Sequence, residues 1–311
     1  MKSSYQHTIK KTCVLEGTSL HSGIYSKVKL HPAPANTGIK FKRIDSDLPL
    51  NQRIIDALIC NVKSSQLCTS IENEFGLRVS TIEHLMAALH AIGIDNLLID
   101  IDNDEMPILD GSSLQYCLAL EKVGLKKLKA KRKFLNILKP IIVKRDDAFI
   151  KILPNNQLSI DYTINYPGTA VGNQNIAIES LNEHSFKNLL SDCRTFTFET
   201  ELEKLKTNGI IKGGSLDNAV VFGENEPLNS DGLKFYNEPV RHKALDAIGD
   251  LYLTGSHVLA HIEAYCAGHS LTHLAIREIF SDDNNWNLIT IDEQSDYKML
   301  PGELSVNSIN L

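Results

Sequence analysis

The stretch Arg241-His242-Lys243-Ala244-Leu245-Asp246-Ala247-Ile248-Gly249-Asp250-Leu251 predicts a helix with two chemically different faces. His242, Asp246 and Asp250 follow one another at intervals of four residues. Together with Lys243 they occupy an arc of roughly 100° around the helix axis. We therefore expect one face to pack in a core and the other to carry side chains capable of chemistry. The core face would consist of Ala244, Leu245, Ile248, Leu251 and Tyr252.

The polar face of this helix suits a metal ion. His242 and Asp246 lie one turn apart, which is close enough for both to bind one ion. Asp250, one turn further along, could orient a catalytic group, as carboxylates behind metal ligands do. The alternative is a solvated face with an ion pair from Lys243 to Asp246 or Asp250. Solvated faces more often mix Glu, Lys, Gln and Ser, so the pattern favours the metal site.

A second helix is predicted from Ser80 to Ile92, because its apolar residues recur at helical spacing. His84 lies nearly opposite the apolar face and Glu83 to its side, so neither is needed for the local core. Glu83 could complete a capping box with Ser80. Alternatively it is a general base beside a metal ligand, an adjacency that His-Glu-x-x-His sites also use. This segment alone favours the capping box and a surface histidine.

The third candidate segment ends in Gly268-His269. An apolar run over 258–262 predicts a strand, and Gly268 permits a turn or a close backbone approach. His269 would then lie at the end of a strand or loop, where catalytic groups often lie. An ordinary loop histidine explains it equally well. Three other histidines lack comparable context and are expected to be structural: His257, His261 and His273.

Strands and helices alternate irregularly along the chain, which favours an α+β fold over βαβ repeats. Strands are predicted at 28–30, 39–42, 97–101, 134–138, 149–153 and 158–164. Further helices are predicted at 182–190 and 199–208, and the helix quoted above is expected to extend over 241–253. Lys212-Gly213-Gly214-Ser215 is expected to be a helix stop and tight turn rather than a phosphate loop.

Six of the eight residues from Lys126 to Lys133 are basic. Like charges repel one another and keep such a segment solvated. We therefore predict a linker here, which divides the chain into an N-terminal domain of residues 1–128 and a C-terminal domain of residues 129–311. Contact with phosphate or anionic lipid is the alternative.

Bulk composition excludes several classes of protein. The net charge of −6 over 311 residues provides no basic field for nucleic acid. The six cysteines form no Cys-x-x-Cys pair, which is typical of free thiols in a reducing compartment. The chain has neither a signal-peptide core nor 18 consecutive apolar residues. We expect a cytoplasmic protein without a transmembrane segment.

Taken together, these segments resemble one family, the UDP-3-O-acyl-N-acetylglucosamine deacetylases, which act at the committed step of lipid A biosynthesis. The resemblance implies two similar α+β domains, each a β-sheet backed by helices, packed helix layer to helix layer. It extends over nearly the whole chain, through residues 17–23, 32–38, 80–85, 93–96, 107–112, 194–196, 213–215, 241–251 and 268–269.

The resemblance also implies a zinc hydrolase and a set of roles. One Zn²⁺, or Fe²⁺ in the cell, would be bound by His84, His242 and Asp246. Glu83 would be the general base and His269 the general acid, with Asp250 as its orienting partner. Lys243 and Thr195 would contact the substrate or the developing oxyanion, and Phe196 the sugar or nucleotide. An acyl-chain passage would be lined by Leu202, Ile211, Ser215 and Ala219.

One departure from the family concerns Tyr265-Cys266-Ala267-Gly268-His269. The family often has Lys at the position of Cys266, and a thiol cannot hold a phosphate as an ammonium group does. The implied partner is an acylated UDP-sugar, with no nucleic acid and with a monomeric chain that could touch a membrane surface. The alternatives are a zinc amidohydrolase for another acetylated substrate and a non-catalytic nucleic-acid-binding module. The net charge and the aligned His-Asp-Asp face argue against the second.

Overall fold

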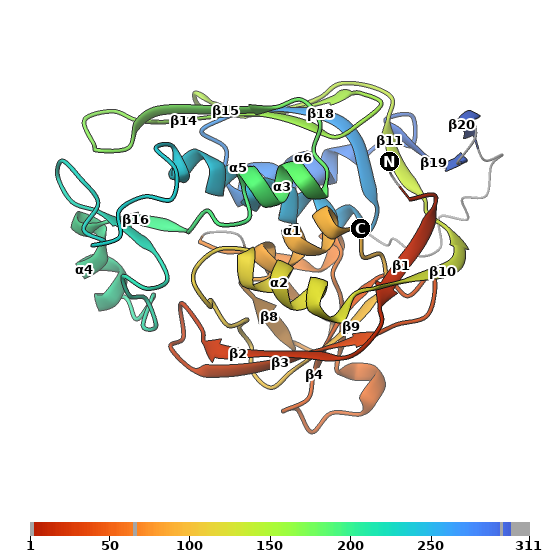
Figure 1. The fold of residues 1–311 in the computed structure, drawn as a ribbon, viewed down its shortest axis with the longest axis horizontal. Helices are drawn as coiled ribbons and strands as arrows, with labels where there is room; N and C mark the ends of the chain where they lie inside the picture. Colours follow the sequence, from red (N-terminus) through yellow and green to blue (C-terminus); the bar gives the residue numbers. More distant parts are fainter. Residues whose placement is uncertain (1–2, 65–66, 293–294, 300–311) are drawn as a thin grey trace.

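The computed structural model describes residues 3–64, 67–292 and 295–299. The end of the predicted C-terminal domain, residues 300–311, lies outside the described residues. Two sheet layers form the outside of the molecule, with a layer of helices between them (Figure 1). The predicted α+β class and the helix-to-helix packing are therefore confirmed. The predicted similarity of the two halves in topology stays a prediction.

The first sheet has five strands in the order β2 (Cys13–Thr18), β3 (Tyr25–Pro32), β9 (Leu97–Ile101), β4 (Ile39–Arg43) and β5 (Ile54–Asp56). Alternate residues of β9 are buried, as expected for a sheet with one face on a core. Helices α1 (Glu83–Ile92) and α2 (Leu114–Val123) cover that face (Figure 1). A smaller three-stranded sheet consists of β6 (Val62–Ser64), β7 (Ser70–Glu72) and β8 (Arg78–Ser80).

The second sheet is built around β18 (His257–Tyr265), which pairs with three other strands. Its eight strands are covered by α3 (Glu183–Leu189), α5 (Glu238–Leu251) and α6 (His269–Ile279) (Figure 1). The remaining strands of this sheet are β11 (Phe134–Ile137), β12 (Ile141–Arg145), β13 (Ala148–Pro154), β14 (Ser159–Tyr166), β15 (Gly172–Ile178), β19 (Trp286–Asp292) and β20 (Ser295–Met299). A short pair, β16 (Phe196–Phe198) and β17 (Val220–Phe222), flanks α4 (Glu199–Thr207).

The segment predicted to link the two halves forms a strand. Residues Leu125–Lys131 form a strand, β10, which pairs antiparallel with β1 (Tyr5–Ile9). A strand can hold its backbone in a sheet and still keep its lysine side chains in water, so the charge of this segment did not reveal its backbone pairing. Lys127 and Lys131 lie over the ring of Tyr5. The boundary at residue 128 falls inside β10 and stays a proposal.

The two halves meet where α1 packs against α5 (Figure 1). Nearly every residue of both helices is buried, because each has its own sheet on one side and the other helix opposite. One hydrophobic core extends through both halves. Polar side chains at this crossing are consequently shielded from water, and they are the residues that the sequence singled out. No helix in the described ranges has both the length and the apolar character that crossing a membrane requires.

Candidate active site

The three candidate metal ligands come together at the crossing of α1 and α5. The ligand atoms of His84, His242 and Asp246 all lie within 4.8 Å of one another. Asp246 Oδ1 is 3.2 Å from His242 Nε2 and 3.7 Å from His84 Nε2. The residues are buried, with at most 5% of any of them exposed. Two imidazoles and a carboxylate therefore face one point from two helices.

The chemistry of these donors fits a metal ion. Burial lowers the pKa of both histidines, that of His84 to about 3, so both imidazoles are neutral. Burial opposes ionisation of Asp246, but His242 and Lys243 outweigh it and lower the pKa of Asp246 to about 2. Asp246 Oδ1 accepts no hydrogen bond from the described residues although it is buried. A buried carboxylate oxygen between two neutral imidazoles is the arrangement that a divalent cation satisfies.

Glu83 is the first residue of α1, and only 3% of it is exposed. Its burial raises the pKa of the carboxyl to about 8. Glu83 Oε2 accepts the backbone N–H of Thr69 at 3.1 Å, and Oε1 faces His269 Nε2 at 3.5 Å. The predicted capping box is wrong, because Ser80 lies in β8 and the cap residue, Ile82, makes no side-chain bond. The Glu83 side chain turns toward His269 instead of its own helix end.

His269 is the first residue of α6 and follows β18 closely, so it is no loop histidine. Its Nδ1–H donates to Asp250 Oδ2 at 2.7 Å. Burial alone would lower the pKa of His269, but the Asp250 carboxylate outweighs it and raises the pKa to about 9. Burial likewise works against the Asp250 charge, yet His269 and His273 hold the pKa of that carboxyl well below its usual range. The pair is therefore imidazolium and carboxylate.

Two residues of this cluster were missed in the sequence. The Thr69 hydroxyl donates to Asp250 Oδ1 at 2.5 Å, and His273 Nε2 lies 3.2 Å from the same oxygen. His273 follows His269 by four residues on α6, so a helix prediction there would have found it. Thr69 lies just before β7 and carries no signal, because it reaches Asp250 from 181 residues away in the chain.

Lys243 joins the candidate metal site to an aromatic side chain. Its Nζ donates to Asp246 Oδ2 at 3.1 Å and lies 5.9 Å from the centre of the Phe196 ring. The ion pair that we considered for a solvated face is present, but the face is buried. Thr195 precedes Phe196, and its backbone pairs with Gly111 and Val220.

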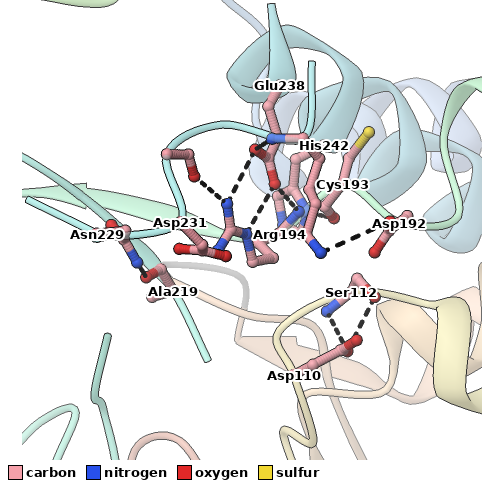
Figure 2. A network of polar contacts seen from close by, with 12 residues as sticks. Asp110, Ser112, Asp192, Cys193, Arg194, Ala219, Asn229, Asp231, Glu238 and His242 are labelled. Atoms are coloured by element: carbon pink, nitrogen blue, oxygen red, sulfur yellow. Dashed lines mark hydrogen bonds and ion pairs between the residues drawn. The ribbon is translucent and has the colours of Figure 1, made fainter. Parts of the chain in front are cut away.

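The segment before Thr195 is held by a buried ion pair (Figure 2). Arg194 Nε donates to Glu238 Oε1 at 3.0 Å, and Glu238 is the first residue of α5. The neighbouring carbonyl of Cys193 accepts Nδ1–H of His242 at 3.0 Å. Because a carbonyl only accepts, this bond leaves the Nε2 lone pair of His242 pointing toward Asp246.

The four residues expected to line an acyl passage lie in α4 and in the segment between α4 and β17. No hydrogen bond, ion pair or ring contact in the described ranges connects them to the metal cluster. The glycine pair nearby is no helix stop, because α4 ends at Thr207. Gly213 instead packs on the 18–20 segment, where a Cβ atom would come within 2.2 Å of the Ser19 carbonyl oxygen. The four residues expected to line the acyl passage are Leu202, Ile211, Ser215 and Ala219.

Comparison with known proteins identifies the family of this chain. A family model described as LpxC, UDP-3-O-acyl N-acetylglycosamine deacetylase, matches residues 6–281. A protein of Idiomarina loihiensis named UDP-3-O-acyl-N-acetylglucosamine deacetylase is 40% identical over 291 residues, which cover 93% of this chain and 94% of the relative. A protein of the same name from Syntrophotalea carbinolica is 41% identical, over 95% of this chain and 94% of its own length. Another, from Aliivibrio fischeri, is 37% identical, over 94% of this chain and 95% of its own length. The chain belongs to the LpxC family of UDP-3-O-acyl N-acetylglycosamine deacetylases.

Proposed function

We propose that this protein hydrolyses the acetamide of UDP-3-O-acyl-N-acetylglucosamine to UDP-3-O-acyl-glucosamine and acetate, a step of lipid A biosynthesis. The names of its relatives supply the substrate. The observation that carries the chemistry is the cluster at the α1–α5 crossing. Three donors for a cation face one point there, with a buried carboxylate and an imidazolium beside them.

Zn²⁺ is the ion that two neutral imidazoles and one carboxylate favour in a hydrolase, with Fe²⁺ as an alternative in the cell. Held by His84, His242 and Asp246, it would polarise the acetamide carbonyl and make a water molecule more acidic. The remaining chemistry is proton transfer, for which the chain supplies its own groups.

Glu83 removes a proton from the attacking water while the water oxygen adds to the acetyl carbon. Burial raises the pKa of Glu83 to about 8, so the carboxylate is a stronger base than an ordinary glutamate whenever it is ionised. The C–N bond then breaks, and the leaving nitrogen needs a proton. His269 donates it from its charged form, which Asp250 stabilises through the 2.7 Å hydrogen bond. The products are acetate and the free amine, so atoms and charges balance.

Lys243 and Thr195 are proposed to contact the substrate or the oxyanion that develops at the carbonyl. Phe196, which lies beside Lys243, is proposed to pack against the sugar or nucleotide. The acyl chain is proposed to run along the segment from α4 to β17, past Leu202, Ile211, Ser215 and Ala219. Every group in this account comes from one chain, and we propose that the protein acts as a monomer in the cytoplasm.

Acetate release from acylated and from unacylated UDP-N-acetylglucosamine tests the substrate assignment. We expect efficient release from the acylated sugar and a much lower kcat/KM for the unacylated one, because binding energy from the acyl chain is lost. Equal rates would favour an amidohydrolase for a different acetamide. The absence of release from both sugars would overturn the proposed reaction.

A further inference from the structure

The peptide bond between Cys193 and Arg194 is held on both sides by one turn of α5 (Figure 2). Its carbonyl accepts Nδ1–H of His242 at 3.0 Å, and its N–H donates to Glu238 Oε1 at 2.9 Å. Glu238 and His242 are four residues apart on α5, so their side chains lie on the same face. A planar peptide has its C=O and N–H in one rigid unit, so what fixes one end orients the other.

The side chain of Arg194 reinforces the end at Glu238. Nε and Nη2 lie 3.0 and 3.3 Å from the two carboxylate oxygens of Glu238. The guanidinium also donates to Asp231 at 2.9 Å and to the Gly232 carbonyl at 2.7 Å. Glu238 Oε2 accepts the Lys234 backbone N–H at 2.7 Å. Glu238 is fully buried and Arg194 is 4% exposed, so water does not compete for these bonds.

The other end of the peptide decides how His242 presents its ring. With Nδ1 protonated and bonded to the Cys193 carbonyl, Nε2 keeps its lone pair and faces Asp246 Oδ1 at 3.2 Å. If the carbonyl turned away, the ring would lose the one backbone partner that it has among the described residues, and it could rotate or exchange tautomer. Hydrogen-bond partners behind a metal-binding histidine are typically worth about 10–100-fold in metal affinity.

We propose that the Arg194–Glu238 pair is a positioning device for the metal centre. The pair fixes the orientation of the 193–194 peptide, and the peptide fixes the tautomer and the ring plane of His242. This inference rests on the proposed role of His242 as a metal ligand. A purely structural role is the alternative, because removing one partner of a buried ion pair destabilises a protein wherever the pair lies.

The chain offers a matched control for the structural role. Arg132 donates to both carboxylate oxygens of Asp95 at 2.7 Å, and the side chains are 6% and 13% exposed. Neither residue contacts His84, His242 or Asp246 among the described interactions. Asp95→Asn therefore weakens a comparable buried pair without touching the candidate metal site.

The test measures the affinity of the metal-free protein for Zn²⁺ and Co²⁺ by competition with a chromophoric chelator, at a temperature where each variant is folded. Glu238→Gln is expected to bind both ions about 10–100-fold more weakly than the wild type. Arg194→Lys, which keeps the charge and loses the forked geometry, is expected to weaken binding in the same direction and provides a second variant if Glu238→Gln does not fold. Asp95→Asn is expected to lower the unfolding temperature and leave affinity unchanged.

Heteronuclear NMR of the imidazole nitrogens gives a readout without metal. His242 is expected to be protonated at Nδ1 in the wild type and to populate both tautomers in Glu238→Gln. The positioning role would be overturned if Glu238→Gln and Arg194→Lys lost stability as Asp95→Asn does but kept the wild-type metal affinity and the Nδ1–H tautomer of His242. If the wild type bound neither ion, or His242→Ala bound as tightly as wild type, the proposed metal centre itself would be wrong.

Discussion

Gly249 of α5 lies against the backbone of Glu83 in α1. A Cβ atom at Gly249 would come within 2.1 Å of the Glu83 carbonyl oxygen and 2.9 Å of its carbonyl carbon. These are backbone atoms, which cannot turn aside as a side chain can. The absence of a side chain at one position therefore sets the distance between the proposed base and the helix that carries His242, Asp246 and Asp250.

Gly249→Ala is expected to separate the two helices. Overpacking of this kind costs about 1–3 kcal/mol of folding free energy. A displacement of about 1 Å at catalytic groups can cost about 100-fold in rate. Thermal unfolding and kcat measure the two effects. Gly17→Ala is the control, because a Cβ there meets only side-chain atoms at 3.6 Å. A Gly249→Ala enzyme with wild-type kcat would show that the helix separation does not matter.

Glu83→Gln tests the general base. The amide keeps the shape of the side chain but cannot take a proton, so kcat is expected to fall by about 10²–10⁴. The metal content should not change, since Glu83 is not one of the three candidate ligands. Acetate release at saturating substrate, together with metal analysis of the purified variant, measures both. A Glu83→Gln variant that retained most of its activity would overturn the assignment of Glu83 as the general base.

Asp250→Asn is expected to alter the pH dependence of the reaction. The rate should fall as pH rises through the pKa of His269, because the imidazolium loses the proton that it must donate. The Asp250 carboxylate is what outweighs burial and raises that pKa to about 9. A neutral amide removes this effect, so the pKa falls and the alkaline limb of the pH–rate profile moves to lower pH. An unchanged alkaline limb would assign that limb to another group.

Thr69→Val is expected to lower kcat by about 10–100-fold. It removes the hydroxyl that donates to Asp250 Oδ1, and a hydrogen bond to a charged group is worth about 1.5–3 kcal/mol. The backbone N–H that Glu83 accepts is retained, so the effect isolates the hydroxyl. Thr69→Ser keeps the donor and serves as the matched control. Equal losses in the Val and Ser variants would point to packing rather than to the hydrogen bond.

Helical periodicity predicted the part of the site that lies on α5, because its polar face belongs to one continuous helix. Glu83, His84 and His269 were indicated by the family resemblance and not by their own segments. The spacing of four residues was sufficient to predict that His242, Asp246 and Asp250 share one face. The same reasoning applied to α6 would have found His273, since Leu271, Ala275, Ile276 and Ile279 are buried at helical intervals. No helix was predicted over this segment, so His273 was expected to be structural.

Burial of the polar faces could not be predicted from either helix alone. Each helix has a polar side that looks suited to solvent, and only their crossing removes that side from water. The same holds for Thr69, whose hydroxyl meets Asp250 across the two halves. The lysine-rich strand β10 was not predicted, because side-chain charge says nothing about backbone pairing. The roles of the site residues stay predictions until variants are measured.

Acetate release from the acylated UDP-sugar, measured before and after removal of metal by a chelator and again after addition of Zn²⁺, tests the central claim most directly. A metal centre at His84, His242 and Asp246 predicts that activity is lost with the ion and returns with about one equivalent of Zn²⁺. The account would be contradicted if metal analysis showed that the protein was free of metal and its activity nevertheless persisted.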